Sequence, residues 1–153
     1  MAKFSFNGMD ELSASFEDMI QLSDEERMSV IMPGAEVVAE HQCGKIRSLF
    51  KQRSGALADS ITIRQKSDDY GAYANIFLKG KHPGSGTGKR KRKDGRSNGK
   101  YSGTNAEVGY ILEYGSPRIA ATHWMESANE DAAAEVASAQ QEAWNDLMKK
   151  KGL

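Results

Sequence analysis

Residues 125–148, MESANEDAAAEVASAQQEAWNDLM, contain the clearest structural signal in the chain. Apolar side chains recur there every three or four residues, which places them on one face of a helix. Acidic residues avoid that face, and three lysines at 149–151 follow where a helix dipole is negative. The pattern predicts a helix of about 24 residues, roughly 36 Å long, whose alanines allow close contact with a sheet or another helix. The apolar face comprises Met125, Ala128, Ala132, Val136, Ala139, Ala143 and Leu147.

Upstream of this helix the pattern is typical of strands. Residues 61–66 alternate and are rich in β-branched side chains, and residues 72–78 form a second apolar run. Asp68-Asp69-Tyr70-Gly71 between them supplies turn residues, so the two segments predict a hairpin. Residues 106–110 are predicted to form a third strand, and residues 111–117 a short turn or helix.

The N-terminal third is predicted to be helical. Leu12, Phe16, Met19 and Ile20 share one face of a helix over residues 9–22. Residues 23–26, Ser-Asp-Glu-Glu, form a capping box that predicts a second helix from residue 24. Pro33-Gly34 is expected to kink or break that helix, with a further helix over residues 35–51.

These elements together predict a single α+β domain over residues 1–153. It has N-terminal helices, a small antiparallel sheet with a long basic loop insertion, and a long C-terminal helix packed on the sheet. The chain has one cysteine, which excludes a disulfide framework and a multi-cysteine zinc site. No stretch approaches the ~20 apolar residues of a membrane span.

The formal net charge of zero conceals an uneven distribution of charge. Residues 79–100 hold nine basic residues and one acid, a net of +8, and the rest of the chain carries −8. The Gly-rich segment 79–105 is therefore predicted to be a flexible loop that contacts a polyanion such as a phosphate backbone. A solvated linker, or a loop that contacts an acidic protein surface, is equally consistent with this composition. The predicted contact residues are Lys89, Arg90, Lys91, Arg92, Lys93, Arg96 and Lys100.

No pattern in the sequence predicts catalysis. Residues 84–89, GSGTGK, resemble a phosphate-binding loop only in part, because Pro83 stands where the first glycine is needed and Arg90 where the hydroxyl is needed. The histidines His41, His82 and His123 belong to no recognisable ligand set. We therefore predict a protein that is not an enzyme and has no cofactor, no metal site and no catalytic residues.

Two segments resemble a known family. Residues 53–61, RSGALADSI, resemble a motif of the form R-[TS]-G-x-L-x-x-S-I, and residues 108–118, VGYILEYGSPR, resemble the signature A-x-Y-[VL]-E-[FY]-G-[TS]. An aromatic residue, Trp124, and an alanine-bearing helix then follow, as they do in the tail-completion (head–tail joining) proteins of long-tailed bacteriophages. The likeness covers roughly residues 35–148. His123 departs from it, because family members usually have proline there, and so does the length of the basic loop.

The resemblance implies a structural virion protein at the phage neck, assembled in the host cytoplasm. It would form a homo-oligomeric ring, a hexamer rather than a dodecamer, that completes the tail and joins it to the head. The implied partners are further copies of the chain, the head connector or stopper protein, and a tail terminator or tail tube protein. Double-stranded DNA would pass through the ring non-specifically, and no membrane is involved. The motif residues that become candidates for subunit contacts are Arg53, Gly55, Leu57, Glu113, Tyr114, Gly115, Arg118 and Trp124.

Physical roles can be assigned to several of these residues. Gly55 would provide a turn between helix and strand, with Leu57 anchoring it. Glu113 and Arg118 are candidates for an ion pair between subunits, whereas Leu112 and Tyr114 are expected to pack beneath the long helix. Two other functions remain open: a small non-specific DNA-binding protein that acts through residues 79–100, and a tail terminator or minor tail protein.

Overall fold

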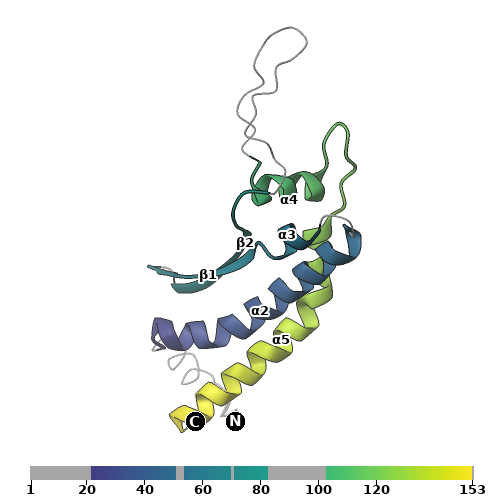
Figure 1. Cartoon of the computed structure of the whole chain (residues 1–153). Helices are drawn as coiled ribbons and strands as arrows, with labels where there is room; N and C mark the ends of the chain where they lie inside the picture. Colours follow the sequence, from purple (N-terminus) through teal and green to yellow (C-terminus); the bar gives the residue numbers. More distant parts are fainter. Residues whose placement is uncertain (1–21, 51–53, 70, 83–102, 153) are drawn as a thin grey trace, which may run out of the picture.

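The computed structural model describes residues 22–50, 54–69, 71–82 and 103–152. Its elements are α2 (Asp24–Leu49), α3 (Ser54–Ala58), β1 (Ile61–Asp68), β2 (Gly71–Leu78), α4 (Asn105–Tyr114) and α5 (Trp124–Lys151). Helix α2 lies between the β1–β2 hairpin and α5, and α4 lies above the end of the hairpin (Figure 1). The predicted α+β class is confirmed. The helix predicted over residues 9–22 and the basic residues 89–100 lie outside the described residues, apart from Leu22.

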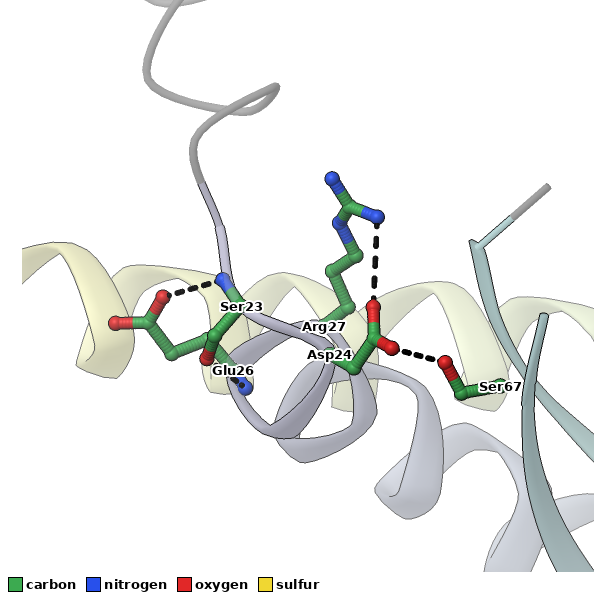
Figure 2. Close-up of polar contacts among 5 residues, drawn as sticks. All are labelled: Ser23, Asp24, Glu26, Arg27 and Ser67. Atoms are coloured by element: carbon green, nitrogen blue, oxygen red, sulfur yellow. Dashed lines mark hydrogen bonds and ion pairs between the residues drawn. The ribbon is translucent and has the colours of Figure 1, made fainter. Parts of the chain in front are cut away.

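The start of α2 follows the local sequence. The Ser23 hydroxyl accepts a hydrogen bond from the Glu26 N–H at 3.3 Å, and the Glu26 carboxylate accepts one from the Ser23 N–H at 2.9 Å. This is the predicted capping box, and the helix begins at Asp24 as expected. The Asp24 carboxylate also accepts a hydrogen bond from the Ser67 hydroxyl of β1 and pairs with Arg27 (Figure 2). The capped end of α2 is thereby tied to the hairpin.

Of the kink or break predicted at Pro33-Gly34, the break does not occur. Helix α2 runs through both residues for 26 residues, so the segment predicted as a separate helix over 35–51 is its continuation. Proline inside a helix costs about 3 kcal/mol, and packing against α5 offsets that cost here. Gly34 is buried, and a Cβ at this position would lie 2.8–3.0 Å from the side chain of Gln140 in α5. The glycine lets the two helices approach closely at this crossing.

Helices α2 and α5 run antiparallel and are joined by polar pairs along their length. Glu26 at the start of α2 pairs with Lys151 at the end of α5, which lowers the pKa of the Glu26 carboxyl. Lys45 near the end of α2 pairs with Asp131, and its hydrogen bond lowers the pKa of that carboxyl. Two further pairs, each at 2.9 Å, join the same two helices: His41–Glu135 and Gln42–Asn129.

The long C-terminal helix has 28 residues and keeps the predicted apolar face. Ala128 and Ala132 are almost fully buried, and the later members of the face, Val136 to Leu147, are half-buried. The face packs against α2, and at its first residue the helix joins the sheet, because Trp124 belongs to the same buried cluster as Leu78 of β2. That cluster is the core of the described fold and comprises Ile46, Leu57, Ala58, Leu78 and Trp124.

The hairpin forms as predicted, with β1 and β2 antiparallel and Asp68 paired with Gly71 at the turn. The predicted third strand is wrong, because residues 106–110 lie in α4. Thr104 and Glu107 make a second capping box at the start of this helix, with bonds of 3.2 and 3.3 Å. The capping box favours a helix that starts here, whereas the short apolar run at 106–110 does not by itself distinguish a helix from a strand.

Candidate interaction surface at helix α4

Helix α4 is held in place by close contact with the core. The indole N–H of Trp124, a fully buried side chain, donates a hydrogen bond to the Gly109 carbonyl at 3.1 Å. Gly109 is buried as well, and a Cβ there would overlap the Leu78 side chain and contact the Trp124 ring. The position therefore admits only glycine without rearrangement of the core.

Glu113 links the end of α4 to the start of α5. Its side chain is 5% exposed, and its two carboxylate oxygens accept hydrogen bonds from the N–H groups of Met125 at 2.7 Å and Glu126 at 3.2 Å. His123, at the N-cap position of α5, has left-handed backbone angles and makes no capping side-chain bond. Glu113 thus supplies the cap from another helix, and its negative charge suits the positive end of the α5 dipole.

The loop between these helices folds back on the end of α4. Gly115 has φ +81°, and a Cβ at this position would lie 2.9 Å from backbone atoms of Ile119 and Ala121. The Leu112 carbonyl accepts hydrogen bonds from both the N–H and the hydroxyl of Thr122, at 2.9 and 2.7 Å. Gly115 therefore forms a tight corner at the end of α4, and the close approach and the left-handed backbone both require glycine.

The outward side of this region is apolar and aromatic. Tyr110 and Tyr114 are 65% and 64% exposed, with ring centroids 4.7 Å apart at an interplanar angle of 48°. Ile119 in the following loop is 45% exposed, and Arg118 beside it is exposed. These four residues are called the α4 surface below. Exposed aromatic side chains with a neighbouring arginine are enriched in the energetic centres of protein interfaces.

Three of the predicted subunit-contact residues are corrected by their burial. Leu57 and Trp124 are 2% and 0% exposed and belong to the core, so they stabilise the monomer instead. The predicted ion pair between subunits is wrong for Glu113, because both of its oxygens are bound inside the chain.

Five further motif residues have different outcomes. Gly55 lies within the short helix α3 without a positive φ, so its predicted role as a turn is also wrong. Tyr114 does not pack beneath the long helix as expected, whereas Leu112 does pack against the core. Arg118 is exposed, as a contact residue must be, and Arg53 lies outside the described residues.

The structure also assigns roles to residues that are not among the predicted contact residues. Tyr110 and Ile119 belong to the α4 surface, and Gly109 sets the position of α4. Tyr110 and Tyr114 are four residues apart, which places them on one face of a helix. This spacing is visible in the sequence, but it indicates a shared face only if residues 106–110 are helical.

A candidate cation site occurs beside the Glu113 cap. Single ligand atoms of Glu113, His123 and Glu126 lie within 4.8 Å of one another. The Glu113 oxygens already accept two backbone hydrogen bonds, and the positive end of the α5 dipole disfavours a cation. The role of this cluster is therefore to cap the N-terminus of α5.

The two ends of the basic insertion are held side by side next to α4. Gly103 accepts a hydrogen bond from the His82 N–H at 2.7 Å, and Gly80 accepts one from the Asn105 N–H at 3.0 Å. The side chain of Asn105, which is 4% exposed, donates to the Lys79 carbonyl and contacts the His82 ring. Residues 83–102 therefore leave and re-enter the fold at one point, close to the start of α4.

Comparison with protein-family models, with curated proteins and with solved structures found no match for this chain. Within the described part of the chain, none of the helices combines the length and the apolar character of a membrane span. The function is therefore argued from the residues and their geometry.

Proposed function

We propose that this chain is a structural protein of a tailed bacteriophage virion, which forms a homo-oligomeric ring at the neck. The ring completes the tail, joins it to the head connector and leaves a channel for DNA. The chain acts by surface complementarity and carries out no chemistry.

The observation that carries this proposal is the arrangement of the two motif segments. They are about 50 residues apart in the sequence, yet Leu57 of the first and Trp124, just after the second, lie in one buried cluster. Val108 and Leu112 of the second segment pack against the same cluster. The resemblance therefore covers one structural unit, whose buried side is the core and whose exposed side is the α4 surface.

The chemistry of the α4 surface favours assembly over catalysis. Two adjacent tyrosines supply a large contact area with few rotatable bonds, and Arg118 adds a charged group at the rim. The basic insertion begins and ends beside this surface. In a ring, that position would bring the insertion either to the DNA channel or to an acidic neighbouring ring.

The proposal is tested by imaging the native particle and by capture of its neighbours. A density map of the phage neck should contain a ring of this fold, and the tagged chain should capture the connector or the tail terminator. The double variant Tyr110→Ser with Tyr114→Ser should lose that capture while keeping the native circular dichroism spectrum. The control, Glu36→Gln, changes an exposed residue of α2 and should keep it.

A different location of the density would replace the neck assignment. A ring that belongs to the tail tube itself would favour a tail terminator or minor tail protein. A monomer or dimer that binds DNA strongly in a salt-dependent way and captures no virion protein would favour the small DNA-binding protein.

A further inference from the structure

Within the described residues, the β1–β2 hairpin has an open edge without the protection that is common in natural sheets. The sheet of the described residues contains two strands only, and the backbone of residues 71–78 makes no hydrogen bond outside its ladder with β1 among those residues. No described residue outside β1 therefore pairs with the outer N–H and C=O groups of β2, which can bind another strand.

The two edges of the hairpin differ in charge. Strand β1 contains Arg64, Lys66 and Asp68, all exposed, and charged side chains of this kind discourage pairing with another chain. Strand β2, GAYANIFL, contains no charged residue and no proline over eight residues. Natural proteins seldom leave such an edge uncovered, because it templates association.

The register within the hairpin defines the two faces of β2. Ser67 of β1 contacts Asp24 of α2, so the face that includes Ser67 and its partner Ala72 is turned toward α2. Tyr73, Asn75 and Phe77 lie on the opposite face, where the Arg64 guanidinium stands 5.0 Å from the centre of the Phe77 ring. Tyr73 and Asn75 are exposed there.

We propose that β2 pairs with β2 of a second copy of this chain, antiparallel across a two-fold axis at Asn75. A two-fold axis perpendicular to the sheet keeps like faces together, so residues pair when both lie on the same face. With Asn75 opposite its own counterpart, Tyr73 of each copy faces Phe77 of the other, which gives two cross-strand aromatic pairs. This register places no charged side chains of β2 opposite each other, whereas pairing through β1 would place Arg64 and Lys66 near their own counterparts.

This pairing concerns the free protein and does not rest on the neck assignment. Edges of eight residues span about 27 Å and bury less than a standard interface of roughly 1,600 Å². We therefore expect a concentration-dependent dimer with a dissociation constant on the order of micromolar. Such a dimer would cover the edge until the protein is assembled.

The test is sedimentation equilibrium of the full chain over a range of concentrations. Asn75→Glu places two carboxylates together on the axis and should weaken the dimer by about tenfold or more. Within one hairpin the new carboxylate faces Arg64, so the variant should fold at least as well as the native chain. Asn75→Gln is the neutral control and should dimerise normally, as should Gln65→Glu, which adds the same charge to β1.

A charge-complementation experiment sharpens this test. Asn75→Lys alone should also weaken the dimer, and an equimolar mixture with Asn75→Glu should restore a dimer that contains one copy of each. Because the introduced ammonium group would lie opposite Arg64 within the hairpin, the folding of the Asn75→Lys variant is checked by circular dichroism.

Three outcomes would overturn the inference. The first is a native chain that stays monomeric at every concentration, and the second is an Asn75→Glu variant that dimerises as the native chain does. A larger ring that is insensitive to Asn75→Glu would also remove the pairing, yet it would leave the proposed neck function intact.

Discussion

Glu113 shows how one buried carboxylate can join two helices. It stands next to the exposed Tyr114 in the motif, but it is 5% exposed and caps α5 from the end of α4. The left-handed conformation of His123 leaves the start of α5 without a cap of its own. Glu113, which the motif predicts as a subunit-contact residue, therefore has a structural role inside the fold.

Removal of this cap should destabilise the protein. Glu113→Ala takes away both acceptors and leaves two N–H groups near the core unpaired, so we expect a loss of about 2–3 kcal/mol in the free energy of unfolding. Glu113→Gln keeps one acceptor oxygen and should lose less. Urea denaturation followed by circular dichroism measures both values. Equal stability of the alanine variant and the native chain would show that water replaces the cap.

At the scale of elements, the position of α4 depends on a glycine, whose lack of a side chain allows close packing. Gly109 lies against Leu78 of β2 and Trp124 of α5, so three elements meet at a residue that has no Cβ. With α4 held against the core at Gly109, Tyr110 and Tyr114 remain exposed and form part of the α4 surface. A change in packing at Gly109 is thus a change in the proposed interaction surface.

Gly109→Ala is expected to destabilise the protein although alanine is the better helix former. Helix propensity favours alanine by about 1 kcal/mol, and overpacking of the core costs about 1–3 kcal/mol. We expect a net loss in the free energy of unfolding, measured by urea denaturation.

The double variant Gly109→Ala with Leu78→Ala provides the control. Leu78→Ala removes the side chain that a Cβ at residue 109 would overlap. The double variant should therefore lose less free energy of unfolding than the sum of the losses of the two single variants. Strict additivity would contradict the proposed clash. Gly44→Ala, at an exposed helix position where a Cβ meets nothing within 4 Å, should instead stabilise the chain.

At the scale of the whole molecule, the fold carries an acidic body and a basic insertion that can be separated. The insertion enters at His82 and leaves at Gly103, and the hydrogen bonds that join these two ends belong to the described fold. Lys81 and Thr104 add an antiparallel bridge at the same point. The charge of the insertion can therefore be removed without loss of the core.

Replacement of residues 83–102 by a short glycine–serine linker should leave the fold intact. We expect the free energy of unfolding to change by no more than about 1 kcal/mol, because the ends are already adjacent and a shorter loop closes at lower entropic cost. The net charge should fall from zero to −6, since seven basic residues and one acid are removed.

Retention on immobilised double-stranded DNA reports on the function of the insertion. The native chain should be retained at low salt and released as salt rises, and the shortened chain should not be retained. Salt-dependent retention that survives the replacement would end the interpretation of this segment as a polyanion contact.

The sequence by itself determined the elements whose signals are local. The cap at Ser23, the turn between β1 and β2, and the apolar face of α5 each depend on residues a few positions apart, and each is present as predicted. The interactions that define these elements lie within one turn of helix or one pair of strands. The elements can therefore be predicted without knowledge of tertiary contacts.

Only the tertiary structure decided the features that depend on distant residues. Helix α2 continues through Pro33 because α5, about 100 residues later, packs against Gly34. The helical start of α4 has a local signal, the capping box of Thr104 and Glu107, but the position of this helix depends on distant residues, because Gly109 lies against Trp124 and Leu78. Glu113 is buried because the start of α5 needs an acceptor that its own residues do not provide. In each case the stabilising partner lies in another element, and the local sequence does not specify where that partner will be.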